Sequence, residues 1–240
     1  AHGINAGVLR AHREGIVTAA TLMANAYAAT EAGLLARETP SLDVGVHLTL
    51  TYGRPLADSR LLPSLVEPDG TFPRAPEAFR GTGRANRDEA LVEYSAQYLR
   101  AAELIGHAPS HLDTHHWLHD EPALEWAIAA LAGETGAAVR PHDGVQRGRL
   151  RAAGVRTVDA YLREFQHDRV DATTLERIFA TIADGVVELG CHPGEADAEL
   201  AATSSYAALR PIELATLTDA RARASVDRHG IVLTTYADLP

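Results

Sequence analysis

A nine-residue stretch from position 111 to position 119 concentrates side chains that bind metal ions. It reads His-Leu-Asp-Thr-His-His-Trp-Leu-His, with four imidazoles and one carboxylate. Neutral imidazole and carboxylate are the ligands that zinc and similar divalent ions prefer. Residues at i, i+2 and i+4 of an extended segment point to one side, so His111, Asp113 and His115 are expected to share a face. The stretch therefore predicts the rim of a metal site.

Further polar residues stand where predicted strands end. Val44–Leu50 alternates strictly and puts a histidine opposite the apolar side of a strand. In parallel α/β folds, chemistry gathers at the carboxyl ends of strands. Four residues are expected to converge there: His47, His115, Arg140 and His192. A structural role for any single histidine stays open, and His116 and His119 are interpreted as supporting or surface residues.

Helical and extended patterns alternate along the chain, which predicts one α/β domain over residues 1–240 with a largely parallel sheet and outer helices. The stripe of helix 87–105 that should face the core includes Tyr94 and Leu99, and Thr173 with Glu176 has the spacing of a capping box. Helices are predicted over residues 5–13, 26–37, 87–105, 122–131, 173–182 and 218–228. Strands are predicted over 16–23, 44–50, 137–140, 186–190 and 231–236, besides the histidine-rich segment, and a long loop over 52–83.

Composition excludes several classes of partner. The 240 residues are 46% apolar and carry a formal charge of −10, and no cluster of lysine and arginine is present, which disfavours nucleic acid and anionic membrane surfaces. No apolar stretch approaches the roughly 18 residues that a membrane span needs. Cys191 is the only cysteine, so an intrachain disulfide is impossible and a reducing cytoplasmic location is expected.

Several segments of the chain resemble, in order, the motifs of the YdjC/ChbG carbohydrate deacetylase family. The resemblance covers nearly the whole chain and implies a distorted (β/α) barrel of the glycoside hydrolase/deacetylase type. It also implies removal of acetyl from an N-acetylated amino sugar or chitooligosaccharide, one divalent metal ion (Mg or Zn), and a possible homodimer. The segments are Gly15–Thr18, Leu22–Asn25, Gly45–Leu50, Pro109–His116, Cys191–Pro193 and Arg210–Leu214.

The resemblance also implies roles for individual residues. His47 and His115 match the two histidine ligands of the metal, and His192 matches the histidine thought to act as general acid. The family opens with a strand ending in Ala-Asp-Asp-Phe-Gly, which supplies a metal-binding aspartate and a candidate base. This chain starts at Ala1-His2-Gly3, just after that point. The first strand and the third ligand are therefore expected upstream of Ala1, and the domain is expected to be N-terminally incomplete.

Three other residues are assigned to the predicted site. Arg140 is expected to orient the upstream carboxylate or to stabilise developing negative charge, although a structural ion pair explains it equally well. Trp117 is expected either to form a platform under a pyranose ring or to pack at the rim. Asp113 is placed with Trp117 among the substrate-binding residues.

Other functions compete with hydrolysis of an acetamide. A non-catalytic sugar-binding homologue is the strongest rival, and a metal-dependent phosphoesterase is a weaker one because the chain has no glycine-rich phosphate loop. The spacing of His115 and His119 imitates that of a helical metalloprotease, but His116 stands where the glutamate base would be. A zinc protease is therefore disfavoured.

Overall fold

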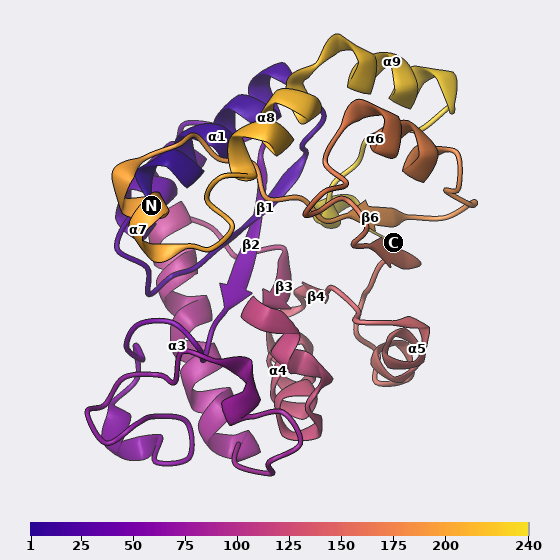
Figure 1. The fold of residues 1–240 in the computed structure, drawn as a ribbon. Coiled ribbons are helices and arrows are strands. Elements are labelled where there is room, and N and C mark those ends of the chain that lie inside the picture. Colours follow the sequence, from indigo (N-terminus) through magenta and orange to yellow (C-terminus); the bar gives the residue numbers. More distant parts are fainter. Residues whose placement is uncertain (240) are drawn as a thin grey trace.

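The first half of the chain forms a sheet of four parallel strands in the computed structural model. The structure describes residues 1–239, apart from the side chains of Glu199 and Thr203. The strands lie side by side in chain order and alternate with helices (Figure 1). The predicted α/β fold with a parallel sheet is confirmed. The strands are β1 (Ala19–Leu22), β2 (Asp43–Leu48), β3 (His111–Thr114) and β4 (Ala138–Val139). The helices between them are α2 (Ala29–Arg37), α3 (Arg87–Ile105) and α4 (Pro122–Thr135).

The second half of the chain forms a smaller parallel sheet from β5 (Ala160–Leu162) and β6 (Val187–Leu189). The remaining helices are α1 (His2–Glu14), α5 (Gly144–Ala152), α6 (Ala172–Phe179), α7 (Ala198–Thr203), α8 (Arg210–Thr218) and α9 (Ala220–Arg228). Helix α1 contacts α8, although the two are far apart in sequence, and α6 contacts α9. Both pairs lie along one side of the molecule in Figure 1. Among residues 1–239, no helix has both the length and the apolar character needed to cross a membrane.

Helix α3 has the predicted bounds because both of its ends are capped. The Asn86 side chain accepts hydrogen bonds from the backbone N–H groups of Asp88 and Glu89, at 2.8 and 3.2 Å. At the other end Gly106 adopts a left-handed conformation, with φ of 85°. The expectation that Leu99 faces the core is wrong, since this side chain is 67% exposed.

The buried side of α3 instead includes two polar residues, Glu93 and Gln97. The Glu93 carboxylate accepts the backbone N–H groups of Leu56 and Ala57 at 2.9–3.1 Å, and Gln97 bonds both backbone groups of Thr49. The helix therefore turns polar side chains inward because the loop after β2 needs hydrogen-bond partners. The predicted long loop over residues 52–83 contains only two short 3₁₀ helices, Ser59–Leu61 and Pro76–Ala78.

The predicted strand over residues 231–236 is wrong. These residues join no ladder within the described chain, Val232 is 84% exposed, and the segment ends in the 3₁₀ helix Tyr236–Asp238. Alternating apolar residues predict a strand only where a neighbouring strand supplies hydrogen bonds, and none of the described strands does so here.

Two helix boundaries also differ from the prediction. Helix α6 is capped by Asp171, which accepts the Thr174 N–H at 2.8 Å, so the Thr173 capping box does not form. Asp219 separates α8 from α9, because its side chain caps the second helix and breaks the predicted 218–228 helix at its start. Helices α5, α7 and α8 and strand β5 were not predicted. Helix α5 contains two glycines and three arginines, which hide any apolar period.

Gly45 on β2 shows how closely this strand packs against its neighbour β3, which contains His111. A Cβ atom at this position would lie 2.6 Å from His111 Nδ1 and would also overlap the His111 carbonyl oxygen. We expect Gly45→Ala to destabilise the protein by about 1–3 kcal/mol, because the strands must move apart. The melting temperature should fall by about 2–4 °C for each kcal/mol, measured by circular dichroism.

Gly133→Ala is the matched control for this substitution. Gly133 lies within α4, and no atom lies within 4 Å of the position that its Cβ would take. Alanine in a helix is favoured over glycine by about 0.5–1 kcal/mol, so this variant should melt at or above the parent temperature. Equal melting temperatures for the two variants would contradict the packing argument.

Candidate active site

Two histidines from neighbouring strands face each other at the carboxyl end of the main sheet. His47 lies near the end of β2, and His115 directly follows β3 and begins the 3₁₀ helix His115–Asp120. His47 Nε2 is 3.2 Å from His115 Nδ1, and the ring centroids are 5.3 Å apart. The sheet register explains this contact, because His47 pairs with Asp113, two residues before His115. The structure thus brings together the two residues predicted as metal ligands.

The chemistry of this pair suits a divalent cation. Burial, together with the neighbouring His47 and His116, lowers the pKa of His115 to about 2, so the ring is neutral over the physiological range. Neutral imidazole is the form that binds metals. Within residues 1–239 no group of three or more histidine, cysteine, aspartate or glutamate side chains is arranged to hold an ion. The described residues therefore bring together two candidate ligands, and a metal site would need at least one more.

Behind His47, a chain of charged side chains crosses from the main sheet to the smaller one. His47 Nδ1 donates to Asp113 Oδ1 at 2.7 Å, and the other Asp113 oxygen accepts from Arg140 Nη1. Arg140 directly follows β4 and donates two further hydrogen bonds to Glu188 on β6, one of them from Nε at 2.9 Å. Side-chain exposure is only 2% for Asp113 and 16% for both Arg140 and Glu188. These contacts hold Asp113 within the protein, with both oxygens engaged.

The electrostatics of this chain favour the charged forms. Burial alone would raise the pKa of Asp113, yet Arg140 and His47 beside it hold that pKa far below its usual range. Burial alone would lower the pKa of Arg140, but Asp113 and Glu188 raise it. The ionised Asp113 therefore accepts the Nδ1 proton of His47, and His47 Nε2 is left facing His115 Nδ1.

Glu188 and Tyr236 belong to this arrangement, although sequence reasoning missed both. The Tyr236 hydroxyl donates to Glu188, and its ring stacks on His111 with centroids 4.0 Å apart. His111 is 1% exposed and lies in the interior, so it does not join His115 at the rim. A signal for Glu188 was present: it is the one charged residue in the apolar run 186–189, just before Cys191 and His192.

His192 stands in the turn after β6, within electrostatic range of the histidine pair. Its side chain keeps 47% exposure, yet enough protein surrounds the ring that desolvation, with Arg210 and His47 nearby, lowers its pKa to about 4. The backbone of this turn packs directly against the backbone of α1 at Gly7, where a side chain would not fit. A Cβ atom on Gly7 would lie 2.7 Å from the Gly194 carbonyl carbon. Glu195 N–H also donates to the Gly3 carbonyl at 2.7 Å. Helix α1 therefore fixes the position of the His192 turn.

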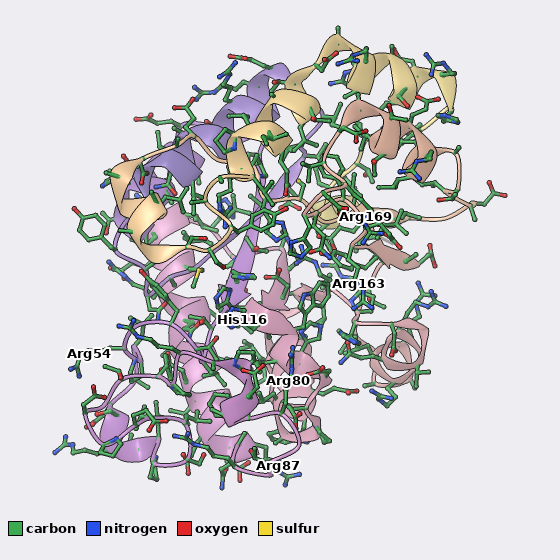
Figure 2. The ribbon with its side chains drawn as sticks, viewed as in Figure 1. Arg54, Arg80, Arg87, His116, Arg163 and Arg169 are labelled. Atoms are coloured by element: carbon green, nitrogen blue, oxygen red, sulfur yellow. The ribbon has the colours of Figure 1, made fainter. Side chains whose placement is uncertain are left out.

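The 3₁₀ helix after β3 contains two consecutive residues in the left-handed region. His116 and Trp117 have φ of 59° and 60°, a conformation that costs a non-glycine residue about 1–3 kcal/mol. Thr51 Oγ1 bonds His116 Nδ1 at 3.0 Å and Arg80 Nη2 donates to the His116 carbonyl at 2.6 Å. Figure 2 shows His116 beside the carboxyl end of β2 and Arg80 below it, in the long loop between β2 and α3. The surrounding contacts thus hold a strained turn at the rim.

Trp117 is partly buried in a cluster that reaches the smaller sheet. Its ring packs edge-on against Tyr161 on β5 and against His142, with ring centroids 4.8 and 5.6 Å apart. The guanidinium carbon of Arg163 lies 6.0 Å from the centroid of the Trp117 ring. Both the packing role and the platform role fit these contacts, so its assignment to substrate stays a prediction. His119 is fully buried and bonded through Nδ1 to Thr114 Oγ1, which excludes the surface position considered for it.

Comparison with known proteins matches the chain over almost its full length. The profile of the YdjC-like protein family matches residues 1–228. A carbohydrate deacetylase from Geobacillus stearothermophilus is 38% identical, over 98% of this chain and 92% of that protein. A chitooligosaccharide deacetylase from Serratia marcescens is 31% identical, over 99% and 94%. A crystal structure from Enterococcus faecalis, provisionally described as a cellobiose-phosphate cleavage protein, superposes with a TM-score of 0.90 at 28% identity, over 98% and 93%.

Proposed function

This chain belongs to the YdjC-like family, and from that premise we propose that it is a carbohydrate deacetylase that hydrolyses the N-acetyl group of an amino sugar or chitooligosaccharide. The observation that carries the proposal is the facing pair of histidines, with His47 Nε2 3.2 Å from His115 Nδ1. The chain that holds this pair aligns over nearly its full length with proteins named as deacetylases. Two imidazoles at the end of a parallel sheet suit amide hydrolysis assisted by a metal ion.

We further propose that His47 and His115 hold one divalent ion, with the third ligand supplied by the aspartate that the family carries upstream of the position of Ala1. Two imidazoles favour zinc or a similar transition ion over magnesium, which prefers oxygen ligands. When bound, such an ion supplies a Lewis acid that polarises the acetyl group and makes water a stronger nucleophile.

The protein's own residues then have distinct tasks. Asp113 and Arg140 keep His47 in one tautomer and one orientation, because Asp113 takes the Nδ1 proton and Arg140 fixes Asp113. This places Asp113 behind His47 rather than against the substrate. His192, with its ring half-exposed, delivers a proton to the nitrogen of the departing amino sugar. Trp117 contributes an apolar face toward the sugar ring.

We also propose that the two sheets form parts of one distorted barrel. A small apolar cluster supports this arrangement, because it joins β1 and β4 of the main sheet to residues that precede β5 and β6. Its buried members are Ala138, Val158, Tyr236 and Leu239, and the partly buried Ala19 and Val186 pack against them. Homodimerisation stays a prediction, for which analytical ultracentrifugation of the purified protein is the direct measurement.

The activity is tested by measuring acetate release from short chitooligosaccharides with the full-length protein. We expect acetate to accumulate in the presence of a divalent ion and to stop when a chelator removes it, because the amide needs metal assistance. Fully deacetylated glucosamine oligomers are the matched control substrate and should yield none.

The same measurements separate the competing functions. Tight binding of chitooligosaccharides without acetate release under any metal condition would favour a sugar-binding homologue. Hydrolysis of sugar phosphates without any attack on acetylated sugars would favour a phosphoesterase. Acetate release that survives complete metal removal would contradict the assignment of His47 and His115.

A further inference from the structure

A buried glutamate on α8 contacts the turn that carries His192. Glu213 is fully buried, and its Oε2 accepts the backbone N–H of His192 at 2.5 Å. Its Oε1 accepts from the Tyr206 hydroxyl and lies 3.9 Å from the ring nitrogen His192 Nδ1. The Glu213 carboxylate therefore contacts His192 twice: it accepts a hydrogen bond from the backbone N–H, and it lies within ion-pairing distance of the ring.

Burying this carboxylate needs compensation, and the charge of the nearby Arg210 supplies part of it by lowering the pKa of Glu213. Among residues 1–239 the ring of His192 is its only ion-pair partner. Burial raises the pKa of Glu213, whereas the Tyr206 hydroxyl and the His192 N–H stabilise its anion. A buried negative charge with few charged partners is costly, so the Glu213 carboxylate favours a proton on the neighbouring His192 ring.

His192 needs such support to act as an acid. Burial, together with Arg210, His47 and Arg140, lowers the pKa of His192, and Asp113 acts in the opposite sense. The groups that face Glu213 are His192, Tyr206, Arg210 and His167. Among the carboxylates that the structure describes, only that of Glu213 lies within ion-pairing distance of the His192 ring.

We propose that Glu213 is the positioning residue of His192: it fixes the turn through the backbone N–H and favours the imidazolium form that donates the proton. Because the two groups lie within ion-pairing distance, their titrations are expected to be coupled. This role rests on the proposed deacetylase function, in which His192 protonates the leaving amine.

The test is Glu213→Gln, which keeps the volume and one carbonyl-type acceptor but removes the charge. An opposite charge at this range shifts a pKa by about one unit or more, so the alkaline limb of the kcat profile should move about one unit to lower pH. At pH 8 the protonated fraction, and with it kcat, should fall about tenfold, while KM and metal content stay at the parent values.

Two matched variants isolate the charge from packing. Tyr206→Phe removes a hydrogen bond to the same carboxylate but keeps its ionisable group, and should move the alkaline limb much less than Glu213→Gln does. Glu134→Gln makes the same substitution at an exposed site on α4 and should behave as the parent. A parent-like profile for Glu213→Gln, or an equal shift in Tyr206→Phe, would overturn the proposal.

A second readout is independent of turnover. The His192 ring can be titrated by NMR in the zinc-loaded protein, with its signals identified by their absence in His192→Ala. A lower titration midpoint in Glu213→Gln supports the pairing, and an unchanged midpoint overturns it. If the parent releases no acetate from any acetylated amino sugar, the deacetylase proposal fails, whereas this titration still decides the role of Glu213.

Discussion

Replacing His115 with alanine is expected to abolish tight binding of the divalent ion and to lower acetate release by about a thousandfold or more. The physical reason is that no third histidine, cysteine, aspartate or glutamate of the described residues is arranged to hold an ion with this pair, so removing His115 leaves His47 without a second candidate ligand. Metal assistance contributes several kcal/mol to such reactions, and each 1.36 kcal/mol is a factor of ten in rate. Metal content by mass spectrometry and acetate release measure the two effects on one preparation.

His47→Ala should produce the same double loss, because His47 forms the other half of the pair. His107→Ala is the matched control, since this histidine is exposed in the loop after α3 and its ring bonds the adjacent Ala108 carbonyl. Parent-like metal affinity in both His47→Ala and His115→Ala would disprove the proposed metal site. An intact fold in the variants is checked by their circular dichroism spectra.

Replacing His192 with alanine should leave the metal in place while kcat falls by about 10²–10⁴, the range for losing general acid–base help. The turn that holds His192 comes from β6, on the smaller sheet, whereas the histidine pair comes from the main sheet. Loss of this ring therefore removes a proton donor without disturbing the ligands. The expected signature is a lower kcat with nearly unchanged KM.

Added imidazole should restore part of the activity of His192→Ala, because the side chain is 47% exposed and its space stays open to small molecules. The same imidazole should not rescue His115→Ala, whose defect is a lost metal ion. Release of the metal by His192→Ala, or turnover at the parent rate, would contradict the assignment of His192 as proton donor.

The residues that converge at the sheet edge were predictable because each signal was local. Strict alternation in Val44–Leu50 put His47 on the polar side, and the strand that ends at Thr114 put His115 just beyond it. Parallel pairing of adjacent strands then brings the two rings together without any further information. Their roles as ligands remain predictions that the metal measurements will decide.

The residues behind the site were not predictable in the same way. Glu188 and Glu213 lie 48 and 21 residues from the groups they bond, on elements whose packing no short-range pattern fixes. The left-handed turn at His116 and Trp117 was also hidden, because neither residue is a glycine and the contacts with Thr51 and Arg80 that support the turn are distant in sequence. Sequence patterns thus identified the residues at the rim but not those that hold them.

The close approach of Gly7 to Gly194 has a consequence for protein engineering and for divergence within the family. Helix α1 and the turn after β6 meet backbone to backbone, so a larger residue on one side is tolerated only if the other side recedes. Substitutions at the two positions should therefore be strongly epistatic. A chimaera assembled from two relatives will keep its activity more readily when residues 1–14 and 190–197 come from the same parent.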